Sequence, residues 1–144
     1  CLAPTLKFLD PKMKGLDFGC GPYPMLAELM RKEHFEMDYY DPFFYPSKER
    51  LQDNYDFVTA TEVVEHFHEP SKSWDELVSR VGRGGVLSVM TSLYTQDLDF
   101  TNWSYRFDHT HVSFYSVKTM NWIAQNHGLE VLEASKNVVI FKKL

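Results

Sequence analysis

The sequence has few cysteines, no long apolar run and no signal-peptide pattern in its first residues. Cys1 and Cys20 are its only cysteines, one terminal and one in a turn, so we expect neither a disulfide framework nor a thiolate metal site. No stretch approaches the ~20 apolar residues that span a bilayer, and the first residues lack the basic and then apolar pattern of a signal peptide. We therefore expect a cytoplasmic protein with no membrane partner.

The sequence also lacks an excess of positive charge. Its formal net charge is −5, which gives no electrostatic footprint for a polyanion, so nucleic acid is not an expected partner. A Gly-x-Ser-x-Gly elbow, a phosphate-binding loop lysine and a Cys-x-x-Cys pair are missing, which argues against hydrolase, nucleoside triphosphatase and redox chemistry. With 144 residues, positions 1–144 are expected to form one domain. The chain begins at Cys1 rather than at methionine, which leaves open a further N-terminal segment.

The chain is organised around the stretch from Lys14 to Pro24. Leu16 to Phe18 is typical of the end of a buried strand, Gly19-Cys20-Gly21 of a tight turn, and Pro24 of the first residue of a helix. Two glycines let the backbone pass close to a ligand, and a helix start presents unpaired N–H groups. Asp17, just before the turn, would repel a phosphate and attract an ammonium. We therefore expect a ligand that carries positive as well as negative groups.

The stretch Leu16-Asp17-Phe18-Gly19-Cys20-Gly21 resembles the first motif of the class I S-adenosylmethionine-dependent methyltransferases, apolar-Asp-x-Gly-x-Gly. S-adenosylmethionine carries an ammonium, a sulfonium and a carboxylate at one end. The alternative is the nicotinamide-binding fingerprint of an oxidoreductase, which needs a third glycine where this chain has Pro24. The methyltransferase pattern often has its third glycine where this chain has Tyr23, but only this pattern explains Asp17. The resemblance implies that the donor is bound by Asp17, Gly19, Cys20 and Gly21.

A second strand is expected over 35–41, ended by Pro42. Asp41 lies 20 residues after Gly21, and neighbouring parallel strands bring their carboxyl ends to one edge, so Asp41 is predicted to accept hydrogen bonds from both ribose hydroxyls. The resemblance places apolar contacts to the adenine at Pro42 and Phe43. The alternative is that Asp41 merely caps the turn at Pro42.

The expected sheet is shorter than usual. Only about a dozen residues separate Asp41 from the next expected strand, 55–61, and a crossover helix needs ~10–12 residues before its returning strand begins. The third strand of the related family therefore does not fit. We expect a Rossmann-like, doubly wound α/β fold, abridged around the third strand, with a mostly parallel sheet of roughly six strands and an antiparallel C-terminal strand.

The stretch from Tyr55 to Pro70 resembles the fourth-strand motif of small-molecule, quinol methylase-like methyltransferases, in which an apolar strand leads into Glu-Val-Leu-Glu-His. Thr61 and Glu62 follow that strand and are expected to border the sulfonium and the methyl group. The alternative for Glu62 is a carboxylate stabilised by the dipole of the following helix. Glu65 and His66 lie one helical turn on, facing either substrate or solvent.

Hydrophobic spacing predicts the remaining elements. A helix around 74–81 is expected to stop at the glycine-rich turn 82–85, followed by a buried strand over 86–90. Ser116 is predicted to cap a helix over 117–126 that is closed by Gly128. The strands 129–134 and 137–142 are expected to form a final antiparallel pair.

The segment 91–115 is rich in aromatic side chains and histidine. It is expected either to form a lid over an apolar or aromatic substrate or to close the core with its rings. A histidine with a pKa near ~6.5 suits removal of a proton from a hydroxyl acceptor at neutral pH. His109 and His111 are the predicted catalytic residues and His66 is a third candidate, with structural packing as the alternative for each.

The pairs His66-x-His68 and His109-x-His111 raise the possibility of a divalent ion, but their spacing matches no established zinc pattern, so we expect no metal. The resemblance implies transfer of a methyl group from S-adenosylmethionine, the one expected cofactor, to a small molecule such as a phenol, a quinol or a sugar derivative. The alternatives are a non-catalytic module that binds the donor and a methyltransferase that acts on a macromolecule.

Overall fold

The computed structural model describes residues 2–52 and 54–144. Six strands form one sheet in the order β2-β1-β3-β4-β6-β5. The strands are β1 (Lys14–Phe18), β2 (Glu36–Tyr40), β3 (Tyr55–Thr61), β4 (Val81–Met90), β5 (Leu129–Ala134) and β6 (Val138–Lys143). The α-helices are α1 (Leu2–Leu6), α2 (Met25–Lys32), α3 (Pro70–Ser79) and α4 (Val117–Asn126), and the short 3₁₀ helices are η1 (Lys48–Leu51), η2 (Val64–His66), η3 (Phe100–Asn102) and η4 (Ser104–Phe107).

The sheet has the expected mixed topology. β1 pairs in parallel with both β2 and β3, and β3 pairs in parallel with β4, whereas β6 is antiparallel to both of its neighbours. Between β2 and β3 the described residues contain η1 and no strand, so the predicted abridgement is confirmed. The chain passes from β1 outward to β2 and then returns to the other side of β1. In doubly wound sheets, ligands bind at such a reversal, outside the carboxyl ends of the strands.

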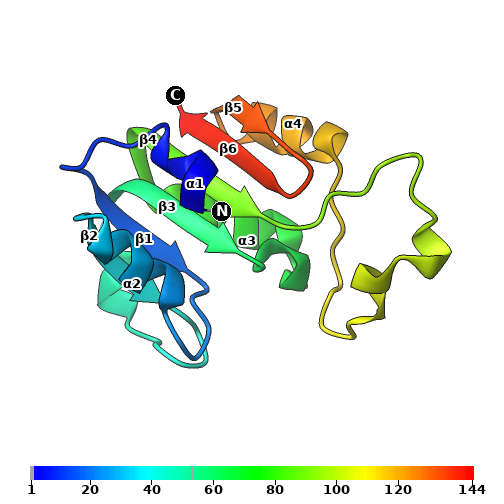
Figure 1. Ribbon diagram of the computed structural model, residues 1–144, viewed down its shortest axis with the longest axis horizontal. Coiled ribbons are helices and arrows are strands. Elements are labelled where there is room, and N and C mark those ends of the chain that lie inside the picture. Colours follow the sequence, from blue (N-terminus) through cyan, green and yellow to red (C-terminus); the bar gives the residue numbers. More distant parts are fainter. Residues whose placement is uncertain (1, 53) are drawn as a thin grey trace.

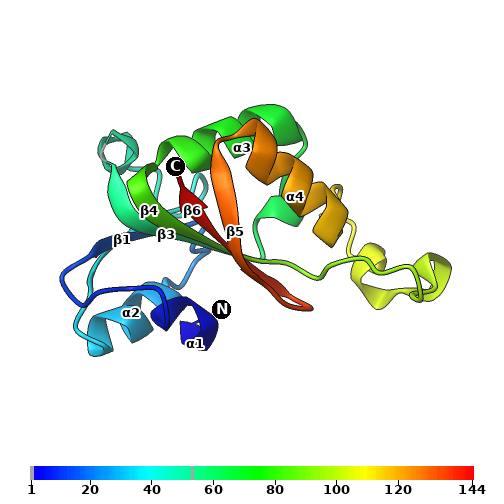
Figure 2. The same ribbon diagram turned by 90° about the horizontal axis from the view of Figure 1, so that it is seen from above.

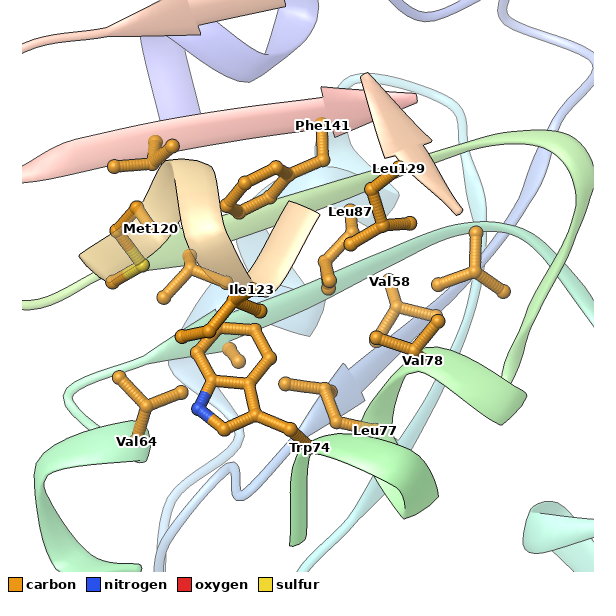
Figure 3. Packing of buried hydrophobic residues seen from close by; sticks show 14 of the residues in the cluster. Val58, Val64, Trp74, Leu77, Val78, Leu87, Met120, Ile123, Leu129 and Phe141 are labelled. Atoms are coloured by element: carbon orange, nitrogen blue, oxygen red, sulfur yellow. The ribbon is translucent and has the colours of Figure 1, made fainter. Parts of the chain in front are cut away.

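The sheet is covered on both faces. Helices α3 and α4 lie over one face and α1 and α2 over the other (Figure 2). Residues of β6 alternate between the two cores: Val139 and Phe141 face α3 and α4, while Val138 and Ile140 belong to the core beneath α1 and α2. Trp74 packs among Ile123, Leu77 and Phe141 in the larger core (Figure 3). None of the helices in the described part of the chain is long and apolar enough to cross a bilayer.

The later elements agree closely with the sequence prediction, apart from the glycine-rich segment 82–85. The Ser116 side chain accepts a hydrogen bond from the backbone N–H of Thr119, which confirms the predicted cap of α4. The helix predicted to run to 81 instead ends at Ser79, and β4 begins at Val81. The pairing of β3 with β4 jumps over this interval, so the segment 82–85 is an irregularity within the strand rather than a turn before it.

Residues 91–115 leave β4 and project away from the sheet before they return to α4 (Figure 1). We call this segment the aromatic arm. It contains η3 and η4 and extends from the edge at which the parallel strands end (Figure 1). The arm and the loops after β1, β2 and β3 therefore border the same region of the molecule.

Candidate active site

The glycine turn, Gly19 to Gly21, connects β1 to the loop before α2. The backbone N–H groups of Gly19 and Cys20 donate to the Tyr40 carbonyl oxygen, at 2.8 and 3.1 Å, and so attach the turn to the end of β2. Gly19 and Gly21 have φ values of +76° and +67°, in the left-handed region that favours glycine. A Cβ atom at Gly19 would lie 2.6 Å from Val63 Cγ2, whereas one at Gly21 would meet nothing within 4 Å. The turn is thus packed on one side and open on the other.

Asp17 is buried directly beneath the glycine turn, with 3% of its surface exposed. Its Oδ1 accepts a hydrogen bond from the Thr59 hydroxyl at 3.0 Å, and its carboxylate also accepts the backbone N–H of Ala27. Burial raises the pKa of Asp17 to about 6, against the opposing effect of these two hydrogen bonds. Since Ala27 lies in the first turn of α2, the carboxylate also stabilises the start of that helix.

Asp41 is buried at the end of β2 and accepts three backbone hydrogen bonds. Its Oδ2 accepts the N–H of Gly21 at 2.9 Å, and its Oδ1 accepts the N–H groups of Phe43 at 2.9 Å and Phe44 at 3.1 Å. Asp41 therefore caps the turn after β2 and fixes the glycine turn. A carboxylate has about four lone-pair sites, so one site on Oδ2 remains for a ligand. The predicted ribose contact of Asp41 remains a prediction.

Cys20 lies half-buried in the glycine turn, with its Sγ 3.4 Å from the Gly21 carbonyl oxygen. Burial, followed by the nearby Asp17 and Asp41 carboxylates, raises the pKa of the thiol to about 12. The side chain is therefore a neutral thiol at physiological pH. It offers packing to a ligand rather than a thiolate nucleophile.

A second group of polar side chains lies after β3. Glu62 has a φ of +53°, unusual for a residue other than glycine, and its N–H donates to the Met90 carbonyl oxygen at 2.8 Å. The Tyr105 hydroxyl lies 2.9 Å from Glu62 Oε2, is hydrogen-bonded to Glu65 Oε1 and lies 3.1 Å from Thr91 Oγ1. One phenol from the aromatic arm therefore links both carboxylates of this segment.

Backbone hydrogen bonds hold the aromatic arm against η2. The Glu65 carbonyl oxygen accepts the N–H groups of Val112 and Ser113, at 2.8 and 3.0 Å. This pairing brings His111 to His66, with ring centroids 4.9 Å apart, and His111 also lies 4.2 Å from the Tyr105 ring centroid. We call Glu62, Glu65, His66, Tyr105 and His111 the carboxylate–histidine cluster.

The aromatic side chains of the arm fall into two groups. Tyr115 is buried in the core, where its hydroxyl accepts the Trp74 indole N–H at 3.2 Å and donates to the Val64 carbonyl oxygen at 2.9 Å. A separate group of rings packs edge to face or tilted on the arm: Tyr94, Phe100, Trp103, Tyr105 and Phe114. Part of the arm therefore closes the core, and the rest forms an aromatic surface beside the cluster.

Comparison with known protein families identifies the family of this chain. A family model described as a methyltransferase domain matches residues 2–134. The chain belongs to this methyltransferase domain family. The resemblance inferred from the Asp17 to Gly21 motif is thereby confirmed. None of the curated proteins matches the chain significantly.

Solved structures with the same fold are numerous but distant in sequence. A SAM-dependent methyltransferase from Archaeoglobus fulgidus has a TM-score of 0.69 and 18% identity, covering 99% of this chain and 91% of that one. An O-methyltransferase family protein from Burkholderia thailandensis has a TM-score of 0.67 and 14% identity, over 90% of this chain and 50% of that one. An O-methyltransferase from neocarzinostatin biosynthesis, crystallised with S-adenosyl-L-homocysteine and 1,4-dihydroxy-2-naphthoic acid, has a TM-score of 0.66 and 15% identity, covering 91% and 49%.

These likenesses confirm the predicted Rossmann-like fold. The chain spans about half the length of the Burkholderia and neocarzinostatin proteins. The methyltransferase domain described here thus corresponds to part of those two proteins and to nearly the whole of the Archaeoglobus protein.

The methyltransferase domain gathers the predicted donor-binding residues at one edge of the sheet. They lie in or beside the loops that follow β1, β2 and β3: Asp17, Gly19, Cys20, Gly21, Asp41, Pro42, Phe43, Thr61 and Glu62. His111 joins the carboxylate–histidine cluster, but His109 is exposed on the arm and is not part of it.

Two residues of the candidate site carry contacts that the sequence did not reveal. Thr59 is the side-chain partner of Asp17, and Tyr105 joins Glu62 to Glu65. Thr59 lies opposite Asp17 in the parallel pairing of β1 with β3, so correct strand pairing would have found it. Tyr105 was one aromatic residue among many in the arm, and no spacing pattern distinguishes it.

Proposed function

We propose that this methyltransferase domain binds S-adenosylmethionine at the glycine turn and methylates a hydroxyl group of a small aromatic molecule held near the carboxylate–histidine cluster. The observation that carries the proposal is the direct packing of Val63 against Gly19. Val63 lies between Glu62 and Val64, so the segment that supplies both carboxylates rests on the predicted donor turn. The predicted donor turn and the groups able to accept a proton therefore lie on adjoining loops.

Four features in and around the glycine turn suit this donor. The open side of Gly21 gives a ligand access to the backbone. The buried Asp17 carboxylate provides negative charge for an ammonium group, and the remaining lone pair of Asp41 provides for one ribose hydroxyl. Phe43, with 87% of its surface exposed, offers a ring for stacking on an adenine.

When bound, S-adenosylmethionine supplies a methyl carbon whose bond to sulfur breaks, leaving the electron pair on sulfur, as the acceptor oxygen forms the new bond. The chain has to orient the acceptor and take the hydroxyl proton. His111 Nδ1 donates to the Tyr105 carbonyl oxygen at 2.7 Å, which leaves the lone pair on Nε2 free to accept a proton. Its contact with the cluster makes His111 a better supported base than His109.

The aromatic arm supports an aromatic acceptor. Its rings pack beside the cluster, and Phe100 and Phe107 remain 41% and 58% exposed. The related O-methyltransferase of neocarzinostatin biosynthesis was crystallised with a dihydroxynaphthoic acid, a ligand with the ring and hydroxyl groups that such a surface would select. Phenols, hydroquinones and hydroxylated naphthoic acids are therefore the acceptors to test first.

Calorimetric titration of S-adenosylmethionine and S-adenosylhomocysteine into the wild type and two matched variants tests the donor site. Phe43→Ala removes an exposed ring next to Asp41, and Phe107→Ala removes an exposed ring from the arm. We expect about fivefold weaker donor binding in Phe43→Ala, because an aromatic stacking contact contributes on the order of 1 kcal/mol, and unchanged binding in Phe107→Ala. Equal affinities in the two variants would contradict the proposed adenine contact.

Turnover is then measured as formation of S-adenosylhomocysteine with each acceptor class. Product that depends on a hydroxylated aromatic compound supports the proposal. Donor binding without turnover on any acceptor would instead indicate a non-catalytic donor-binding module. Absence of donor binding by the wild type would contradict the proposed function as a whole.

A further inference from the structure

Three side chains of the carboxylate–histidine cluster converge in a way that the predicted methyl transfer does not require. Glu65, His66 and His111 each offer one nitrogen or oxygen ligand atom, and these atoms all lie within 4.8 Å of one another. Glu65 and His66 come from η2, whereas His111 lies near the C-terminal end of the aromatic arm. The backbone hydrogen bonds from Val112 and Ser113 to Glu65 create this convergence.

Both histidines are held in the same tautomer. His66 Nδ1 lies 3.0 Å from the Thr110 carbonyl oxygen, and His111 Nδ1 lies 2.7 Å from the Tyr105 carbonyl oxygen. Because a carbonyl only accepts hydrogen bonds, each Nδ1 carries the hydrogen, and in the neutral imidazole Nε2 then keeps its lone pair. Histidines that bind metals are commonly oriented in this way, through a hydrogen bond from the second ring nitrogen to a carbonyl or carboxylate oxygen.

Glu65 is the most constrained member of the cluster. Its side chain is fully buried, and within residues 2–52 and 54–144 its Oε2 has no hydrogen-bond partner. In the same described ranges, neither Glu65 nor Glu62 forms an ion pair with lysine or arginine. A buried carboxylate with a free oxygen is costly unless a donor or a cation occupies that position.

The cluster also has too few protons for its oxygen contacts. The Tyr105 hydroxyl has one hydrogen but contacts Glu62 Oε2 as well as Glu65 Oε1, so it cannot donate to both at once. Glu62 and Glu65 therefore place two carboxylates around one hydroxyl hydrogen. Asp108 adds further negative charge, with its Oδ2 3.6 Å from His111 Nε2. A bound cation would relieve this concentration of charge.

We propose that Glu65, His66 and His111 bind one divalent first-row transition-metal cation, with Glu62 beside it. Two imidazoles and one carboxylate form the ligand set of catalytic zinc and non-haem iron sites, which keep coordination positions open for water or substrate. A hydroxyl bound at an open position would have a lowered pKa. His111 would then act as a ligand rather than as the base, and the cation would orient the acceptor oxygen.

The site goes beyond the proposed methyl transfer, and cation binding is measured without donor or acceptor. Titration with Co²⁺ is expected to give one saturable site with visible d–d absorption bands, and Zn²⁺ is expected to displace the Co²⁺. Since affinity at nitrogen and oxygen ligands rises from Mn²⁺ through Co²⁺ to Cu²⁺, Mn²⁺ is expected to bind more weakly than Co²⁺. Glu65→Gln, which keeps the shape of the side chain, and His111→Ala are each expected to weaken Co²⁺ binding about 100-fold.

His68→Ala and His109→Ala are the matched controls, because each removes a histidine two positions from a proposed ligand and lies outside the convergent group. Both are expected to keep wild-type Co²⁺ affinity. Loss of binding in either control to the same extent as in Glu65→Gln, or absence of a saturable site in the wild type, would overturn the proposal.

Wild-type NMR provides a test that does not depend on the folding of any variant. Paramagnetic Mn²⁺ is expected to broaden the ring signals of His66 and His111 before those of His34 and His127, which belong to other parts of the chain. Uniform broadening of all four histidines would overturn the proposal. Donor titration in the same samples reports separately on the proposed methyltransferase function.

Discussion

Asp41 and Glu65 are both buried carboxylates at the loop edge of the sheet, but their oxygens are satisfied in opposite ways. Asp41 accepts three backbone N–H groups, from Gly21, Phe43 and Phe44. Glu65 shares one phenolic hydrogen with a second carboxylate and leaves an oxygen without a partner in the described chain. The first arrangement is complete without a ligand, whereas the second lacks positive charge.

This difference separates two ways of building a binding site. Around the glycine turn the backbone itself holds the carboxylates, so the proposed donor surface is preorganised by the fold. In the carboxylate–histidine cluster the side chains depend on one another and on a group that the chain does not supply. We therefore expect substitutions at the glycine turn to affect folding as well as binding, and substitutions in the cluster to affect mainly cation binding and catalysis.

The largest effect is expected for Asp41→Ala, which leaves three backbone N–H groups without their acceptor. Hydrogen bonds to a charged group contribute more than neutral ones, so we expect the free energy of unfolding to fall by about 3 kcal/mol, together with loss of donor binding. Urea unfolding and calorimetry measure the two effects. Asp99→Ala, which removes an exposed carboxylate that accepts the Thr101 N–H on the arm, is the control and should leave both unchanged. Similar losses of stability and donor binding in Asp41→Ala and Asp99→Ala would contradict the structural role of Asp41.

An intermediate effect is expected from the titration of Asp17. Its pKa is raised to about 6 by burial, so at pH ~5 only about one molecule in ten carries the charged carboxylate that would attract the donor ammonium. Donor affinity in the wild type should therefore fall about tenfold between pH ~7 and pH ~5, and Asp17→Asn should bind weakly with no such dependence. Calorimetry across this range measures both profiles. A wild-type donor affinity that does not change with pH would show that the charge of Asp17 does not contribute to donor binding.

The stability of the donor-free protein should change with pH in the opposite direction. Because the folded pKa of Asp17 lies above its ordinary value of 3.8, the folded state binds this proton more tightly than the unfolded state does. The resulting stabilisation is present below pH ~4 and is lost as the pH rises through about 6. Comparing urea unfolding of the wild type and Asp17→Asn isolates this contribution from other titrating groups.

The smallest effect is expected for Tyr105→Phe, which removes the hydroxyl between Glu62 and Glu65. The free energy of unfolding should fall by about 1 kcal/mol, because Glu65 loses its hydrogen-bond donor. Added Zn²⁺ should restore the lost stability if the cluster binds a cation. Thermal unfolding with and without Zn²⁺ measures both changes. Tyr94→Phe, at another ring of the arm, is the control. An equal response to Zn²⁺ in Glu65→Gln would place the stabilising ion elsewhere.

Local sequence patterns were sufficient to predict the fold and the glycine turn. Hydrophobic runs and turn residues located β3, β5 and α4 almost to the residue, and the short interval after Asp41 correctly predicted a sheet without the usual third strand. These features are local, because strand periodicity, helix caps and glycine turns depend on neighbouring residues. The order Asp17, Gly19, Gly21 carried the family assignment for the same reason.

The hydrogen-bond partners of the polar residues depend on tertiary packing. Sequence patterns could not show that the Asp41 carboxylate would accept three backbone hydrogen bonds. They also could not show that the glycines at 82–85 would form an irregularity within β4. The convergence of Glu65, His66 and His111 arises because the returning arm pairs with the backbone of η2. Such contacts join residues far apart in the chain, and their hydrogen-bond partners are fixed only when the sheet and the arm pack together.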